Sequence, residues 1–289
     1  MTSPLVFSTP SALEYFAVLV AEDRGLALLE AAISVAQDEY PDLDPQSVLC
    51  EIDALAARLK QRLAVDAPPL QRLRLLNHFF FHELGFAGNV NNYYDPRNSY
   101  INDVLQLRRG LPITLALVYI EIASQLGLNA NGVSFPGHFL MKLQMPRGEV
   151  FIDPFSGHSL SPDELTERLK PYRLQQGLVG DFDIPLGLFL QAASPRDVLA
   201  RLLRNLKALH HHAQDWHRAL AVQQRLVVLL PQDWEETRDR GLVRARLKQW
   251  SEAANDLALY LQHRAEAGDA QTMRQCLHDC LGRRGDTWH

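Results

Sequence analysis

Apolar residues recur with a helical period through most of the first 86 residues. Thr9-Pro10 and Asp44-Pro45 each read as an N-cap followed by proline at the first helical position, a pairing that starts helices. The second pair predicts a helix over residues 45–63. Four apolar side chains of that segment fall on one stripe, which predicts its buried face: Val48, Ile52, Leu55 and Leu59.

The pattern changes in the middle of the chain. Residues 112–126 carry apolar side chains around nearly the whole circumference of a helix that starts at Pro112 and is stopped by Gly127. Such a helix is buried on most sides. The segment after it contains short β-type runs, and Pro146-Arg147-Gly148 predicts the turn of a hairpin. We therefore predict an α+β class, mainly helical, with a small antiparallel sheet.

The predicted hairpin brings a histidine and an aspartate together. If Met145 faces Gly148, then Asp153 faces Leu140, and His138 lies two residues further along on the same face. Diagonal neighbours of this kind are about 7–8 Å apart between backbones, which is within side-chain reach. A carboxylate there could orient the imidazole and favour its charged form. From spacing alone we expect a structural pair, with catalysis as the alternative.

The last third of the chain is helical and repeats itself. Trp216 and Trp250 are 34 residues apart, and Ala219 and Ala253 have the same separation. This is the tetratricopeptide period. Gly241 takes the close-packing glycine position, and a helix over 269–281 is expected to cap the stack. We divide the chain into an N-terminal segment plus core over residues 1–190 and tetratricopeptide-like helices over 191–289.

Composition narrows the classes of function. The 289 residues are 47% apolar, enough for one large or two ordinary globular domains. The net charge of −5 offers no basic surface for direct contact with nucleic acid. No window reaches the roughly 18 uncharged apolar residues of a membrane span, and the N-terminal stretch lacks signal-peptide features. An odd set of three cysteines fits reduced thiols, so we expect a cytoplasmic protein.

One run and two motifs carry a resemblance to a known family. The run is NSYINDVLQLRRGLPITLALVYIEIASQLGL, and the motifs GVSFPGHFLMKL and FIDPFSG follow it. Together they closely resemble the bacterial SirB-type family of transglutaminase-like proteins with C-terminal tetratricopeptide repeats, over roughly residues 40–190. The resemblance implies a papain-like core. In active members of this class a cysteine at a helix N-terminus attacks an acyl group, a histidine is the base and an aspartate orients the histidine.

The resemblance transfers two of these three residues. His138 of PGHF matches the histidine and Asp153 of IDPF matches the aspartate, whereas the nucleophile position falls on Pro112. Its neighbours Leu111 and Ile113 are equally inert. Three ways to regain chemistry stay open: the Thr114 hydroxyl, Cys50 brought close by the fold, or a water activated by His138 and Asp153. Against the second, a lone cysteine in an amphipathic helix is usually a small buried apolar residue.

Other polar residues are candidates for binding rather than for catalysis. The segment 86–103 is rich in asparagine and tyrosine, as expected of a loop that lines a site. In and after it, Asn98, Asn102, Arg109 and Thr114 are hypothetical binding residues beside His138. His210, His211 and His212 with His217 read as a solvated helix end, because consecutive helical residues cannot converge on one ion. Cys276 and Cys280 read as packing of the last helix. We expect neither a metal nor another cofactor.

Two functions follow from these observations. The first is a non-enzymatic one, in which a transglutaminase-like core without its nucleophile acts as a scaffold or regulator, and the core cleft and repeat helices bind a protein partner. The second is a hydrolase or acyltransferase that uses His138 and Asp153 on amide or ester bonds. The sequence leaves the partner or substrate and the oligomeric state open.

Overall fold

The computed structural model describes residues 10–178 and 184–283. Helix accounts for 62% of the described residues, which confirms the predicted mainly helical class. The chain forms two compact units. Among the described residues, the core unit contains 27–36, 42–178 and 184–202, and the repeat unit contains 10–26, 37–41 and 203–283. The predicted domain boundary at residue 190 stays a prediction.

The first half of the core unit is helical. Helix α3 (Pro45–Lys60) begins as predicted, with the Asp44 side chain accepting from the Gln46 amide at 3.0 Å, and its four predicted stripe residues are buried. It ends three residues early, because the Arg62 and Leu63 amides bond to carbonyls three residues back. The other helical elements here are α2 (Leu28–Ser34), η1 (Val35–Asp38, of which residues 35–36 belong to this unit), α4 (Pro69–Asn77), the π-helical η2 (His78–Glu83), η3 (Pro96–Ser99) and α5 (Ile101–Leu107).

An antiparallel sheet forms the second half of the core unit. Its strands run in the order β3 (Asn129–Val133), β4 (Leu140–Met145), β5 (Gly148–Ile152) and β6 (Ser159–Leu160). Met145 pairs with Gly148 and Met141 with Ile152, so the predicted hairpin register is confirmed. Two short parallel strands, β1 (Ala87–Gly88) and β2 (Arg109–Gly110), form a separate pair.

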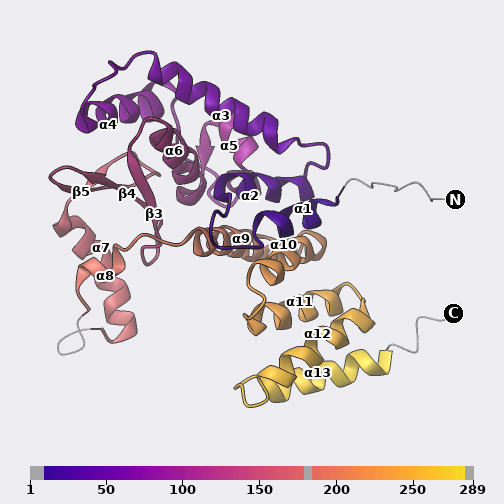
Figure 1. Cartoon of the computed structure of the whole chain (residues 1–289). Coiled ribbons are helices and arrows are strands. Elements are labelled where there is room, and N and C mark those ends of the chain that lie inside the picture. The colour runs from indigo at the N-terminus through magenta and orange to yellow at the C-terminus, as the bar shows by residue number, and fades with distance from the viewer. Residues whose placement is uncertain (1–9, 179–183, 284–289) are drawn as a thin grey trace, which may run out of the picture. The chain divides into compact units, whose positions relative to one another are not determined.

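Helices cover both faces of the sheet. The predicted buried helix is α6 (Pro112–Gln125), which packs on β3 and β4 (Figure 1). Helices α7 (Pro162–Gln176) and α8 (Leu186–Phe189) follow the sheet and form an apolar cluster with residues of its other face. In that cluster Leu140 of β4 packs with Leu165 and Leu169 of α7. The period of two along β4 therefore leaves Met141 and Leu143 on the face toward α6.

The repeat unit consists of antiparallel helix pairs. Its helices are α1 (Ala12–Leu19), α9 (Pro195–His212, from residue 203 onward), α10 (Trp216–Leu229), α11 (Trp234–Arg246), α12 (Trp250–His263) and α13 (Ala270–Arg283). Trp216 and Trp250 each open a helix, as the predicted repeat requires. A Cβ on Gly241 would lie 3.0 Å from the Asp256 Cβ, which explains the glycine at this helix crossing. Thr9 lies outside the described residues. The predicted helix start at Pro10 is wrong, because Ser11 forms a capping box with Glu14 and α1 begins at Ala12.

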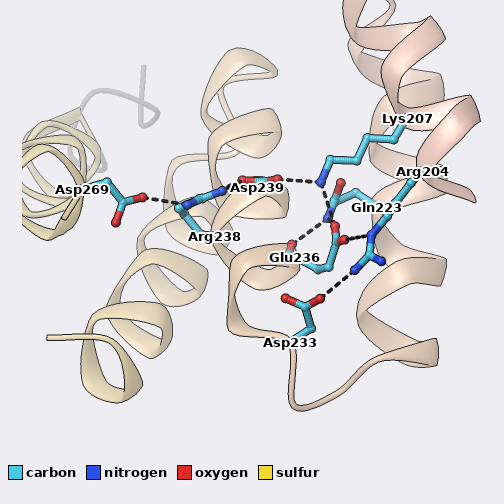
Figure 2. Close-up of polar contacts among 8 residues, drawn as sticks. All are labelled: Arg204, Lys207, Gln223, Asp233, Glu236, Arg238, Asp239 and Asp269. Atoms are coloured by element: carbon cyan, nitrogen blue, oxygen red, sulfur yellow. Dashed lines mark hydrogen bonds and ion pairs between the residues drawn. The ribbon is translucent and has the colours of Figure 1, made fainter. Parts of the chain in front are cut away.

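A network of charged side chains around the buried Glu236 links the repeat helices to one another (Figure 2). The Glu236 carboxylate accepts from Arg204 Nε at 2.8 Å, from Lys207 Nζ at 2.7 Å and from Gln223 Nε2 at 2.8 Å. Burial alone would raise the pKa of Glu236, but these bonds outweigh it and lower the pKa. Lys207 also bonds Asp239, and Arg238 joins Asp239 to Asp269. The network thereby connects α9, α10, α11 and the turn before α13.

A fully buried arginine ties the N-terminal segment to α10. The Arg225 side chain is fully buried, and its guanidinium donates to both oxygens of Asp38 at 2.6 and 2.8 Å. The guanidinium carbon also lies 5.0 Å from the centre of the Phe16 ring. Because Asp38 is the carboxylate that pairs with this cation, it balances a charge that has no access to water.

We expect Asp38→Asn to lower the free energy of unfolding by about 3 kcal/mol, because it leaves a buried guanidinium without a counter-charge. Urea unfolding followed by circular dichroism measures the change. The matched control is Glu39→Gln, which removes the similar pair that Glu39 forms with the half-exposed Arg218. That variant should cost about 1 kcal/mol or less. Equal losses in the two variants would contradict the role assigned to Asp38.

Candidate functional site

His138 is held at the end of a tight turn before β4. Its amide donates to the Phe135 carbonyl at 3.1 Å, with Pro136 and Gly137 between them and Gly137 at φ +71°. Proline followed by a glycine with positive φ is the pattern of a type II turn. Arg201 bonds the carbonyls of Phe135 and His138 at 3.2 and 2.8 Å. The backbone that carries the imidazole is therefore tied down on both sides of the turn.

Asp153 occupies the turn after β5. Its amide donates to the His158 carbonyl and its carbonyl accepts from the Gly157 amide, both at 2.8 Å. Its side-chain Oδ1 accepts from the Phe155 amide at 2.9 Å, an Asx turn of the kind aspartate favours. This loop closes back on itself and points the carboxylate toward β4.

The two side chains meet as the register predicts. His138 Nε2 lies 2.8 Å from Asp153 Oδ1. Burial would raise the pKa of Asp153, but the hydrogen bond and charge of His138, with the Phe155 amide and Arg168, lower it to about 2. The ionised carboxylate has no proton to give, so Nε2 donates. In a neutral imidazole the second nitrogen, Nδ1, is then the basic one.

The environment of His138 is open on one side. Its side chain is 27% exposed, whereas that of Asp153 is 7% exposed. Within the described part of the chain, Nδ1 has no hydrogen-bond partner. The pair can therefore orient a base at Nδ1 toward a substrate or a water, and equally it can clasp the open end of the hairpin.

The predicted nucleophile position is enclosed by protein. Leu111, Pro112 and Ile113 are all buried where α6 begins. Thr114 is fully buried as well, and its hydroxyl lies 2.7 Å from the Asn98 carbonyl and 3.0 Å from the Leu111 carbonyl. A hydroxyl that donates to backbone carbonyls is held in place rather than activated.

The cysteines lie elsewhere in the chain. Cys50 is exposed on α3, so the expectation of a buried residue there is wrong. Cys276 and Cys280 belong to α13 in the repeat unit. The expectation that His210 belongs to a solvated helix end is also wrong, because its side chain is buried. Burial lowers its pKa. Among the residues that the structure describes, no three His, Cys, Asp or Glu side chains are placed to hold a metal ion.

The hypothetical binding residues have contacts within the core unit. Asn98 is buried, and its amide nitrogen donates to the carbonyls of Asn92 and Tyr93 at 2.7 and 3.1 Å. It therefore braces the asparagine- and tyrosine-rich loop. Arg109 is exposed and donates to the Gly85 carbonyl at 2.7 Å. Asn102 is buried, and its Oδ1 has no partner among the described residues.

The braced loop does lie beside the Asp153 turn. The Tyr93 ring is 6.1 Å from the Phe155 ring, and the Gly88 amide donates to the Phe155 carbonyl at 2.8 Å. Gly88 in turn pairs with Gly110, two residues before Pro112. The loop, the Asp153 turn and the start of α6 are thus brought together by the fold.

Two arginines near the pair were not identified from the sequence. Arg168 of α7 donates to Asp153 Oδ2 at 3.1 Å, and Arg201 holds the His138 backbone. Neither belongs to a recognisable motif. Arg201 is 63 residues from His138 along the chain, so only the tertiary structure reveals the contact.

A second candidate surface lies within the repeat unit. We call it the repeat groove; it has a volume of about 480 Å³ and is lined by Trp216, Leu242, Arg246, Trp250, Cys280 and Arg283, among others. These residues come from α10 to α13. Its volume is within the range of about 300–1,000 Å³ that is usual for ligand pockets.

Comparison with known proteins defines the class. Residues 46–204 match the transglutaminase-like superfamily, and residues 206–278 match the tetratricopeptide repeat. These matches confirm the transglutaminase-like and repeat parts of the predicted resemblance. No solved structure matches the chain. Within the described residues, no helix combines the length and apolar character needed to cross a bilayer.

Similar proteins match over nearly the whole chain. A UPF0162 protein of Xylella fastidiosa strain 9a5c is 38% identical over 268 residues, covering 92% of this chain and 94% of the relative. The UPF0162 protein YchA of Escherichia coli K12 is 28% identical over 251 residues, covering 86% and 90%. The chain therefore belongs to the UPF0162 family of transglutaminase-like proteins with tetratricopeptide repeats.

The depressed pKa of Asp153 makes a prediction about pH. The folded-state pKa of about 2 lies below the ordinary value of 3.8, so the ionised group stabilises the fold above about pH 4 and loses this effect as pH falls toward 2. Asp153→Asn should therefore cost about 2 kcal/mol at pH 7 and much less near pH 2. Urea unfolding at several pH values measures the difference.

A matched control for this titration is Glu167→Gln on α7, whose carboxylate is 66% exposed and pairs with Lys170. It should change stability little at any pH. A stability difference between wild type and Asp153→Asn that stays constant from pH 7 to pH 2 would contradict the assigned ionic role.

Proposed function

We propose that this protein is a transglutaminase-like scaffold without a catalytic nucleophile, which binds a protein partner through its repeat helices. The observation that carries the proposal is the burial of Pro112, the residue predicted to stand at the cysteine position of active relatives. Proline has no side-chain group that attacks an acyl carbon. The buried Leu111 and Ile113 on either side support the same conclusion.

The remaining sources of a nucleophile also favour a scaffold. The Thr114 hydroxyl is bonded to two backbone carbonyls, and Cys50 is on an exposed face of α3, a helix that the family's catalytic pattern does not use. The third route, a water activated by His138, needs a group that stabilises an oxyanion. The sequence pattern assigns no residue to that role.

The repeat unit supplies the binding half of the proposal. Tetratricopeptide repeats commonly mediate protein–protein interaction. The repeat groove gives such a partner a surface that combines tryptophan, leucine and arginine side chains, which are typical of contact residues. We also propose a cytoplasmic location without direct contact to nucleic acid, supported by three free cysteines and a net charge of −5.

A scaffold should show no turnover that depends on His138. We expect wild type and His138→Ala to hydrolyse p-nitrophenyl acetate at the same background rate, measured by absorbance at constant pH. His158→Ala is the matched control for imidazole reactivity, because His158 is a neighbouring histidine with an exposed side chain. The proposal would be contradicted if wild type and His158→Ala both hydrolysed the ester about tenfold faster than His138→Ala.

That contradictory outcome would support the second candidate, a hydrolase or acyltransferase for amide or ester bonds. One observation favours it: the imidazole is oriented by Asp153 at 2.8 Å while Nδ1 stays unbonded among the described residues. The chemistry would then be general-base activation of water by Nδ1, with Asp153 as the residue that orients the ring.

Binding at the repeat groove can be tested by photo-crosslinking in cells that produce the full chain. A benzoylphenylalanine in place of Leu242, which lines the groove, should give a discrete protein adduct. The same residue in place of Leu259 is the control, because Leu259 is exposed on α12 outside the groove lining. No adduct from Leu242, or the same adducts from both positions, would contradict binding at this surface.

A further inference from the structure

The repeat groove contains the same arrangement twice. The Arg246 guanidinium lies over the Trp216 ring at 5.7 Å, and the Arg283 guanidinium lies over the Trp250 ring at 5.1 Å. Each tryptophan opens the second helix of a repeat, and each arginine comes from the end of the helix that follows in the stack. Two repeats therefore present two equivalent cation–π stacks to one groove.

These two arginines differ from the other arginines of the repeat unit. Eight others lie between residues 203 and 283, and each of them bonds a carboxylate, a side-chain amide or a backbone carbonyl, as Arg225 and Arg238 do. Arg246 and Arg283 have no hydrogen bond or ion pair with any described residue. Stacking occupies the face of a guanidinium and leaves its in-plane N–H donors free. The N–H donors of both guanidinium groups are therefore available to bind an anion.

Groove charge and lining point to carboxylates on a polypeptide. Arg246 and Arg283 outnumber the one lining carboxylate, Asp279, in a chain whose net charge is −5. Leu242 and the tryptophans supply apolar surface beside them. A guanidinium binds a carboxylate through two parallel hydrogen bonds. Because the stacks recur from one repeat to the next, they suit a chain-like ligand with successive acidic groups.

Single-stranded nucleic acid fits this groove less well. Bases bind such proteins by stacking on open aromatic faces along a strongly positive track. Here a guanidinium already lies over each tryptophan ring, 5.7 Å from the centre of Trp216 and 5.1 Å from the centre of Trp250. An acidic protein segment needs no open aromatic face, because its carboxylates bind the guanidinium groups themselves.

We propose that the repeat groove binds an acidic segment of a partner protein, with two carboxylates held by Arg246 and Arg283 and an apolar side chain placed against Leu242. The inference rests on the proposed function, since it states what kind of partner the repeat helices take. It assigns specificity to the two unpaired guanidinium groups.

The test uses the full chain and a phage-displayed library of random 12-residue peptides. Peptides selected on wild type and depleted on the Arg246→Gln/Arg283→Gln double variant should be enriched in Asp and Glu beside apolar residues. A fluorescein-labelled synthetic copy of the most enriched sequence then serves as probe. Its affinity, by fluorescence anisotropy, should fall about tenfold or more in the double variant. The copy with Asn and Gln in place of its Asp and Glu should be weakened similarly.

Matched variants separate specific contacts from general charge. Arg264→Gln removes an arginine that pairs with Glu235 outside the groove lining, and should leave affinity within about twofold. Arg246→Lys/Arg283→Lys keeps both charges but loses the stacked, bidentate geometry, so intermediate binding is expected. If a glutamine variant fails to fold, a salt titration of wild type still decides, because the affinity should fall as ionic strength rises.

Several outcomes would overturn the inference: no enriched sequence, enrichment of basic or uncharged peptides, binding insensitive to salt and to both arginines, or displacement of the peptide by a uridine homopolymer. These failures are distinguishable from failure of the proposed function. A crosslinked partner at Leu242 that binds the double variant normally would retain the scaffold and reject the acidic segment. If the chain showed His138-dependent turnover and still bound acidic peptides through both arginines, the acidic segment would be retained and the non-catalytic scaffold rejected.

Discussion

Helix α6 has almost no side that meets solvent, and the core unit is organised around this constraint. Strands β3 and β4 pack along it, as does α3. Even its tyrosine, Tyr119, is fully buried; its hydroxyl donates to Asn77, and burial raises its pKa far above the usual range. The first turn of α6 is enclosed by the same packing. The predicted nucleophile position is therefore part of the apolar core in this protein, and Pro112 suits it as the first residue of a helix.

The geometry of the His138–Asp153 pair is fixed by the backbone on both sides. Two turns set it: the type II turn before β4 and the Asx turn after β5. The carboxylate serves His138, the Phe155 amide and Arg168 together, so it holds the end of the hairpin as well as the imidazole. An oriented base is one component of acyl-transfer chemistry, and a structural clasp needs the same hydrogen bonds.

Charges in the repeat unit have two distinct arrangements. In the first, buried carboxylates such as Glu236 are surrounded by cations and amides, and these contacts connect one helix to the next. In the second, Arg246 and Arg283 rest on tryptophan rings without a carboxylate in the described chain. Paired charges stabilise the stack, whereas stacked but unpaired arginines leave donors facing the repeat groove. The same helices therefore carry paired arginines that stabilise the stack and unpaired arginines to which we assign recognition by proposal.

The sequence by itself determined the features that depend on local pattern. Periodicity located α3, α6 and the 34-residue repeat, and the turn at residues 146–148 set the register that joins His138 to Asp153. Contacts between distant segments came only from the tertiary structure. Arg168 and Arg201 contact Asp153 and His138 from helices without a recognisable motif. Arg225 pairs with Asp38, which is 187 residues away along the chain. Cys50 is exposed, although the pattern of its helix favoured burial. Hydrophobic period and turn chemistry act within a few residues, whereas the partner of a charged side chain depends on which elements pack beside it.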